Sequence, residues 1–500
     1  MFDQSRSLKA PSPESAALLD RIGAATRAEN RAAAAQLVAI GELFALRLSR
    51  CGETEEWAVD TEAAVAAEVA AALRISQGLA ASRLGYARAM REDLPQIGAV
   101  FAAGDIGVRV FQTIVYRTAL ITDREVLAAV DAQLAVGVTR WPSLTTRRLA
   151  AKIDAIVAKA DIDALRRRKD HQADRQITFT DYVEGGVTDI SGHLFLTDAR
   201  AVAKALDALS ATVCEHDPRT REQRRADAMG ALAVRADRLG CQCGREDCTA
   251  AGAPGVSSVV IHVIAEQATV DGTGDIPGSL VGVDGLVPPE LIADLAKTAK
   301  LVPLVHPADT PPEPGYVPSK ALAEFVRCRD LTCRWPGCDR PAFDCDIDHT
   351  IPYGEGGRTH ASNLKCYCRT HHLVKTFWGW RDRQLPDGTV ILTAPSGQTY
   401  VSTPGSSLLF PHLCAPTGHL APPTRRPEDR CGQRTAMMPR RKRTRAQDRA
   451  TRIYVERNRN NQARQARYSA CEAARQALWG PWPGPDPIPA DCNDKDPPPF

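Results

Sequence analysis

The sequence predicts a multidomain protein with a mainly helical N-terminal domain, an α+β middle region, a small cysteine-rich module and a disordered basic tail. Its 500 residues exceed what one core ordinarily holds, since a domain averages roughly 150 residues. Alanine is frequent in the first 240 residues, and aromatic residues make up only 5% of the chain. Both features favour helices packed through small side chains over a large β-sandwich.

The N-terminal helical domain is predicted to span residues 14–170. Alanine, leucine, valine and isoleucine recur there every three or four residues, in Ala16–Leu48, Thr61–Met90 and Asp123–Ala135. This spacing is typical of amphipathic helices. Its role is not evident from the residues, and a homo-oligomer formed through this domain is one expectation.

Two neighbouring stretches of this domain resemble a helix-turn-helix. Glu68–Ser76 is followed by Ala80–Leu84, and the second helix would present Ser82, Arg83 and Arg88 to DNA. Two packed helices of an ordinary bundle give the same pattern, so both interpretations remain open.

The middle region, residues 171–302, mixes strand and helix signals. Gln176–Tyr182, Gly192–Leu196 and Val256–Ala265 have the composition of strands. The expected helices are Asp198–Ala211, Arg221–Leu239 and Pro288–Lys300. Residues 303–318 are rich in proline and are expected to be a linker.

A cysteine motif in the middle region suggests a second metal site. Cys241, Cys243 and Cys248 are spaced closely enough to be three ligands of a zinc ion, with His262 or His193 as the fourth. A reduced surface loop explains the same spacing equally well.

The tail, residues 401–500, is rich in proline and arginine and is predicted to be mostly disordered, with a transient helix over 441–478. Residues 425–475 contain 16 Lys/Arg and 5 Asp/Glu, a local charge of +11. The whole chain carries +3, so the remainder carries 3 − 11 = −8. This asymmetry favours contact with nucleic-acid phosphates without sequence reading, although a solvated end needs no such partner.

Two features that the sequence lacks indicate its compartment and argue against membrane association. Residues 1–10 are polar and charged, unlike a secretory signal, and no apolar run approaches the roughly 20 residues of a membrane span. We therefore expect a cytoplasmic protein without a membrane partner, whose clustered cysteines are metal ligands and not disulfides.

The module at residues 319–400 contains two pairs of metal ligands. Cys333 and Cys338 flank a short turn, and Cys368 and His371 are separated by two residues. Twenty-nine residues lie between the pairs. Two short-spaced pairs of this kind supply the four ligands of a structural zinc ion, which would stabilise a small module. Gly379–Gln384 and Thr389–Ala394 are expected to follow as a β-hairpin.

Between the two pairs lies a different ligand set. Asp348 and His349 end an alternating stretch that predicts a strand, and Asn363 precedes a predicted helix carrying His371 and His372. Adjacent helical residues point about 100° apart. One histidine can therefore face the zinc while the other faces the Asp-His pair.

This arrangement over about 50 residues resembles the HNH endonuclease family with its ββα-metal fold. The resemblance implies that His349 is the general base, that Asp348 and His372 hold a catalytic Mg²⁺ or another divalent metal, and that Asn363 orients the His349 loop. In some relatives the equivalent asparagine is itself a ligand. Many relatives also end the zinc site with a second Cys-x-x-Cys. Here the last ligand is His371, which leaves open which of the two adjacent histidines serves which metal.

The layout as a whole is similar to an actinobacterial repeat family that joins a helical domain of unknown function to a C-terminal HNH module. Asp217–Thr220 and Gly315–Pro318 fit that family, over about residues 30–400. The leading hypothesis is a cytoplasmic, nucleoid-associated endonuclease that hydrolyses DNA phosphodiesters with a metal ion. The alternative is a DNA-binding regulator or scaffold that retains the fold without catalysis.

Overall fold

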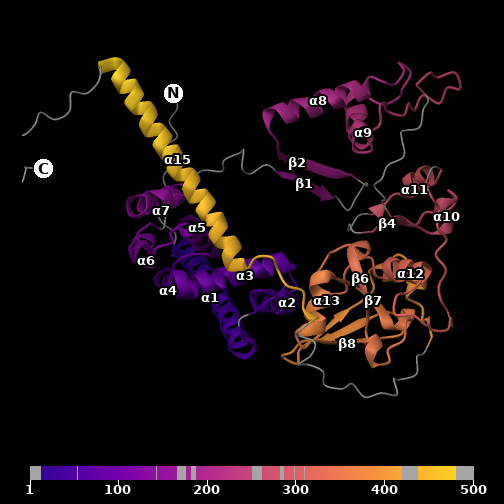
Figure 1. Cartoon of the computed structure of the whole chain (residues 1–500), viewed down its shortest axis with the longest axis horizontal. Coiled ribbons are helices and arrows are strands. Elements are labelled where there is room, and N and C mark those ends of the chain that lie inside the picture. The colour runs from indigo at the N-terminus through magenta and orange to yellow at the C-terminus, as the bar shows by residue number, and fades with distance from the viewer. Residues whose placement is uncertain are drawn as a thin grey trace, which may run out of the picture. The chain divides into compact units, whose positions relative to one another are not determined.

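In the part of the chain that it describes, the computed structural model is mainly helical with four small sheets (Figure 1). It describes residues 13–52, 54–141, 144–165, 176–181, 187–250, 262–281, 286–297, 299–308, 310–418 and 437–479.

The chain forms two compact units instead of the consecutive domains expected from sequence. We call residues 1–42, 85–167 and 442–500 the helical unit, and residues 43–84 and 168–441 the mixed unit. The predicted domain boundary at 170 is therefore wrong for residues 43–84, which pack with the middle and cysteine-rich regions. The physical reason is helix α2, whose small side chains belong to the core of the mixed unit.

The N-terminal helices follow the predicted periodicity and end at recognisable caps. Asp60 caps α2 by accepting a hydrogen bond from the Ala63 N–H at 2.8 Å, and Asp123 caps α6 in the same way. The helices are α1 Pro13–Cys51, α2 Thr61–Leu73, α3 Gln77–Arg88, α4 Pro95–Ala103, α5 Val108–Thr118, α6 Arg124–Val138 and α7 Thr146–Ala160.

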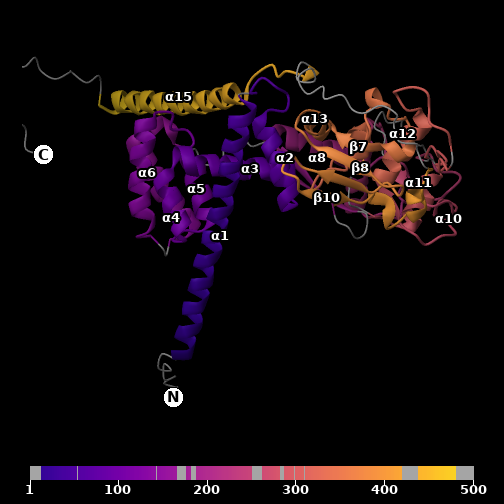
Figure 2. The same cartoon turned by 90° about the horizontal axis from the view of Figure 1, so that it is seen from below.

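The first half of α1 projects away from the other helices of the helical unit (Figure 2). Leu18, Leu19 and Ile22 are exposed there. By length and composition alone, α1 is apolar enough to cross a membrane, contrary to the expectation that no such run exists. A core helix of a soluble protein or a signal sequence passes the same test.

The middle region is α+β, as expected. Strands β1 Gln176–Asp181 and β2 Thr188–His193 form an antiparallel hairpin. A helical hairpin follows, made of α8 Leu196–Ser210 and α9 Arg221–Ala233. Next come a small sheet and two helices, β3 Val263–Ile264, α10 Gln267–Val270, β4 Gly278–Leu280, β5 Leu286–Val287 and α11 Pro289–Ala296. Residues 256–261 of the predicted third strand lie outside the described residues.

The cysteine-rich region begins with α12 Lys320–Asp330 and centres on one hairpin and one helix. Strands β6 Cys345–His349 and β7 Leu364–Cys368 pair antiparallel, with Cys345 opposite Cys368 and His349 opposite Leu364. Helix α13, Arg369–Phe377, continues directly from β7. The expected trailing hairpin is present as β8 Arg381–Gln384 and β9 Val390–Thr393, and a third strand, β10 Thr399–Ser402, completes the sheet.

A buried arginine-aspartate pair ties α12 to the β6–β7 hairpin. Arg329 donates to the carbonyls of Ala361 and Leu364, and Asp330 accepts from the Cys366 N–H at 2.8 Å. Both side chains are at most 3% exposed, so the loss of either partner would leave a buried charge unpaired. The hairpin is thereby held in a fixed place on the core.

The prediction that residues 303–318 are a linker was incomplete. Residues 303–318 contain no helix or strand in their described part, as a linker should, but they pack against the cysteine-rich region. His360 contacts the Thr310 carbonyl at 3.0 Å, and Glu313 pairs with Thr359.

The prediction of a mostly disordered tail is wrong for much of its described part. Phe410 and Leu413 are buried in the core of the mixed unit, which therefore extends beyond residue 401. Helix α15, Arg445–Trp479, packs on the helical unit, where Arg457 pairs with Asp161 and Asn460 donates to the carbonyls of Asp163 and Leu165. These polar anchors are not visible as apolar periodicity, which explains why the sequence analysis missed them.

Candidate functional site

Three cysteines and one histidine converge beside the β6–β7 hairpin. The ligand atoms of Cys333, Cys338, Cys368 and His371 all lie within 4.8 Å of one another. The Nδ1 atom of His371 is 3.5 Å from the Cys333 sulfur and 3.3 Å from the Cys368 sulfur. Zinc bonds of about 2.0–2.3 Å in a tetrahedron place ligand atoms at about these separations. The two short-spaced pairs identified in the sequence therefore meet at one point.

Local backbone geometry builds this cluster from a turn, a strand end and a helix start. Gly337 has φ +73°, and a Cβ atom there would lie 2.5 Å from the Ile75 carbonyl oxygen. Only glycine therefore fits the turn between Cys333 and Cys338. Cys368 ends β7 and precedes α13, and its N–H donates to the Cys333 sulfur at 3.3 Å.

His371 is oriented by a residue that the sequence analysis did not single out. Its Nε2 lies 3.3 Å from the Oε1 atom of Gln77 in α3, whose Nε2 donates to the Ala63 carbonyl at 2.9 Å. The amide oxygen of Gln77 is thus left to accept the histidine Nε2–H, which keeps the Nδ1 lone pair for the sulfur cluster. Trp335 stacks on the same ring at 4.7 Å. No local sequence pattern connects positions 77 and 371.

The remaining cysteines of this region are ordinary packing residues. Burial raises the pKa of Cys328 to about 12 and that of Cys366 well above its usual value, so both remain thiols. The Cys345 thiol donates to the Pro341 carbonyl. By contrast, hydrogen bonds from Cys333 and Cys338 lower the pKa of Cys368.

Asp348 is the centre of a second, charged cluster at the end of β6. Its Oδ2 atom is held by the ammonium groups of Lys365 at 2.9 Å and Lys375 at 2.8 Å, and its Oδ1 atom faces His372 Nε2 at 3.3 Å. Burial alone would raise the pKa of Asp348. Lys365, His372 and Lys375 outweigh burial and keep that pKa well below its usual value. The carboxylate is therefore ionised at neutral pH.

His372 is held by a second carboxylate. Its Nδ1 lies 2.8 Å from the Oδ2 atom of Asp346, and its Nε2 faces Asp348. Burial alone would lower the pKa of His372, but Asp348 and Asp346 outweigh burial and raise it, because both carboxylates accept from the protonated ring. The two adjacent histidines of α13 consequently face different clusters, since His371 points to the sulfurs. Asp346 was not singled out from the sequence, although its alternation with Asp348 along β6 places both on one face.

His349, the predicted base, lies next to Asp348 but is turned toward a different partner. Its Nε2 is 3.0 Å from the hydroxyl of Thr359, which itself donates to the Gly315 carbonyl at 2.5 Å. The ring therefore carries its hydrogen on Nε2 and its lone pair on Nδ1. Burial lowers the pKa of His349, which favours the neutral form. Tyr316 stacks on the ring at 5.2 Å.

Asn363 contacts backbone and not the charged cluster. Its Oδ1 accepts from the Ile351 N–H at 2.8 Å, and its Nδ2 donates to the carbonyls of Ile351 and Arg358. The side chain thus fixes the loop that follows His349, and the structure does not bring it to Asp348 or His372 as a ligand.

Two weaker sequence signals have different outcomes. Helices α2 and α3 are bent by 111° at their junction, an angle found in helix-turn-helix motifs, but Ile75 and Gln77 of this junction contact the cysteine-histidine cluster. In the candidate second metal site, the fourth residue beside Cys241, Cys243 and Cys248 is Cys214, which the sequence analysis did not name. Its predicted fourth ligands lie elsewhere, because His262 stacks on Phe343 at 3.7 Å and His193 is part of β2.

Comparison with known proteins identifies the family. The model of a domain of unknown function, DUF222, matches residues 24–330. The uncharacterized protein Rv3776 of Mycobacterium tuberculosis is 43% identical over 89% of this chain and 90% of its own length. Uncharacterized protein Rv2100 of the same organism is 42% identical over 89% of this chain and 88% of its own length. No solved structure matches. The chain belongs to the DUF222 family.

Proposed function

We propose that this protein is an HNH endonuclease that hydrolyses DNA phosphodiester bonds with a divalent metal ion. The observation that carries the proposal is the pairing of Asp348 Oδ1 with His372 Nε2 at 3.3 Å, beside His349. A β-hairpin followed by a helix supports these residues, which is the arrangement of the ββα-metal fold.

The cysteine-histidine cluster suits a structural zinc ion. Cys333, Cys338, Cys368 and His371 provide all four positions of a tetrahedron, so no position is left for a substrate. The orientation of His371 by Gln77 is the usual outer-shell support of a metal-bound imidazole.

The Asp348–His372 pair suits a second, catalytic divalent ion such as Mg²⁺. Two neighbouring ligands at bond lengths of about 2.1 Å in an octahedron lie roughly 3 Å apart, close to the observed 3.3 Å. The two lysines occupy only Oδ2, so an ion would displace only the proton shared by Oδ1 and His372 Nε2. When bound, such an ion neutralises the scissile phosphate and the leaving 3′ oxygen.

The residues of the chain itself supply the proton transfer. Neutral His349 can accept the proton of the attacking water on Nδ1, because Thr359 holds the Nε2–H. Burial favours this neutral form by lowering the pKa of His349. Asn363 keeps the loop after His349 in place.

A non-catalytic DNA-binding regulator or scaffold is the second candidate, and two observations favour it. His349 is only 4% exposed and lies under the ring of Tyr316. Lys365 and Lys375 also balance the charge of Asp348 without any metal. In that case Asp348, Lys365 and Lys375 would form a purely structural ion-pair network.

Helix α15 supports the proposal that the partner is DNA. Arg452, Arg459 and Arg467 are exposed and, at 100° per residue, fall within an arc of about 80° on one face of the helix. Such a stripe can follow a phosphate backbone without reading sequence. We propose a cytoplasmic, nucleoid-associated protein on this basis.

Replacing Cys338 by serine tests the zinc proposal. We expect the variant to lose one zinc ion per chain, because serine is a poor zinc ligand, and to unfold around β7 and α13. Elemental analysis and hydrogen exchange of residues 364–377 measure both effects. Cys328→Ser is the matched control, since Cys328 is a partly buried thiol outside the cluster and the variant should retain full zinc. Unchanged zinc content in Cys338→Ser would contradict the assignment.

Replacing His349 by alanine tests the base. DNA cleavage should fall by roughly 100- to 10,000-fold under saturating metal, while zinc content and DNA affinity stay unchanged. His412→Ala, at an exposed position, should cleave like the parent. If His349→Ala cleaves as fast as the parent, His349 is not the base.

Replacing Arg452, Arg459 and Arg467 together by glutamine tests the DNA-binding face of α15. Affinity for duplex DNA should fall, and the slope of log affinity against log salt should flatten by up to about 2.7, since each phosphate contact contributes about 0.9. Fluorescence anisotropy at several salt concentrations measures both quantities.

The matched control for this triple variant removes the same charge from another surface. Arg140, Arg147 and Arg148 are exposed in the helical unit, and their replacement by glutamine should leave the salt slope unchanged. Equal slopes for the α15 variant and the parent would show that α15 does not bind phosphates.

A further inference from the structure

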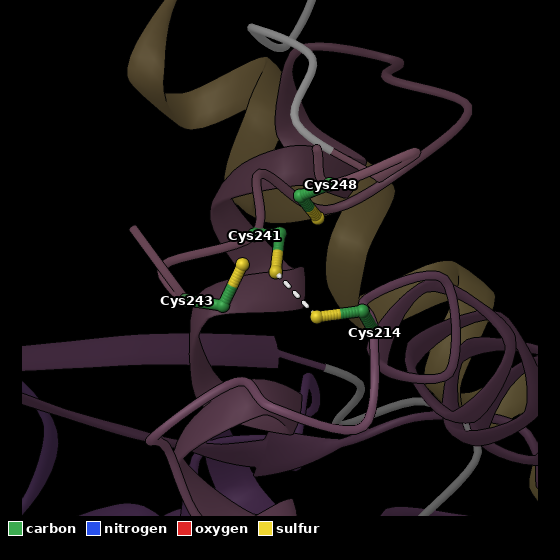
Figure 3. A group of neighbouring side chains, drawn as sticks. All are labelled: Cys214, Cys241, Cys243 and Cys248. Atoms are coloured by element: carbon green, nitrogen blue, oxygen red, sulfur yellow. Dashed lines mark hydrogen bonds between the residues drawn. The ribbon is translucent and has the colours of Figure 1, made fainter. Parts of the chain in front are cut away.

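Four cysteines of the middle region point toward one another (Figure 3). The sulfur atoms of Cys214, Cys241, Cys243 and Cys248 all lie within 4.8 Å of one another, and those of Cys214 and Cys241 are 3.5 Å apart. Cys214 follows helix α8, whereas the other three lie in the loop after α9. Four sulfurs from two separate segments thus surround a single point.

The loop after α9 is shaped to present its three thiols. Gly244, between Cys243 and Cys248, has φ +69°, a conformation that glycine adopts without strain. The Cys248 N–H then donates to the Arg245 carbonyl at 3.3 Å, which closes the turn. This turn is what brings Cys248 back beside Cys243.

A buried aspartate fixes the segment of Cys214 against the loop after α9 without a metal. The carboxylate of Asp217 accepts from the Arg219 side chain at 2.8 Å and from the Gln242 N–H at 2.9 Å. Arg219 also donates to the Gly240 carbonyl at 2.7 Å. These bonds place Cys241 opposite Cys214, so the sulfur cluster is arranged in advance.

The helical hairpin of α8 and α9 has little apolar core of its own. Its buried apolar cluster consists of Leu206, Leu209, Ala228, Ala231 and Leu239. Four partly buried side chains pack against them, those of Val202, Val213, Leu232 and Ala236. This is still a small core for a helical pair, and natural proteins with small cores commonly add a metal or a disulfide. A cross-link between the two segments would therefore stabilise the hairpin.

We propose that Cys214, Cys241, Cys243 and Cys248 bind a structural zinc ion that stabilises the α8–α9 hairpin. Four thiolates fill the tetrahedron of zinc and leave no position for water, so the ion is structural. Each thiol releases its proton to solvent on binding. A disulfide would use only two of the four converging sulfurs and would require them at about 2.05 Å. The site is independent of the nuclease proposal.

The zinc content of the full-length protein, purified under reducing conditions, tests the proposal. We expect two zinc ions per chain, and one after replacement of either Cys214 or Cys243 by serine. Hydrogen exchange should rise at residues 196–233 in both variants and stay unchanged at residues 364–377. Cys471→Ser, an exposed cysteine of α15, is the control and should retain both ions.

Cobalt substitution gives a second readout that does not depend on a variant folding. Cobalt(II) in the parent should show the charge-transfer and ligand-field bands of a four-thiolate centre. The proposal is overturned if Cys214→Ser and Cys243→Ser keep the zinc content of the parent. It is equally overturned if mass spectrometry finds Cys214 disulfide-bonded or the site filled by iron.

Discussion

The approach of Cys333, Cys338, Cys368 and His371 to one point is the constraint on which the candidate site depends. It joins a turn, the end of β7 and the first turn of α13. Because His371 is thereby fixed toward the sulfurs, the next residue of the helix must point about 100° away. His372 consequently faces Asp346 and Asp348. The cysteine-histidine cluster thus orients the histidine of the charged cluster.

The cysteine-rich region is also supported by residues far away in the sequence. Helix α2 contributes Ala63, Ala67 and Ala71 to the core that contains Trp335, and α3 supplies Gln77 to His371. The DUF222 match ends at residue 330, before the first cysteine of the cluster. Residues 43–84 and 168–330 of this match therefore lie in the same compact unit as the candidate site, and residues 63–77 support the cysteine-histidine cluster from outside.

Local spacing predicted the ligand pairs, the β6 strand and the adjacent histidines, because these features depend on residues close in the sequence. It did not predict Gln77, Lys365 or Lys375, whose roles arise only when distant segments pack. Cys214 was missed for the same reason, since it lies 27 positions before Cys241. The helix over 441–478 was expected only as a transient one, because α15 is anchored by Arg457 and Asn460 and not by an apolar face.

The nuclease account is tested most directly by incubating the purified full-length chain with supercoiled plasmid. Reactions contain magnesium or manganese, or a chelator too weak to remove structural zinc. The account predicts nicked or linear DNA with the added ion and intact plasmid with the chelator, at unchanged zinc content. Plasmid that is bound but never cut, with any divalent ion and at any protein concentration, would contradict it and favour the DNA-binding regulator.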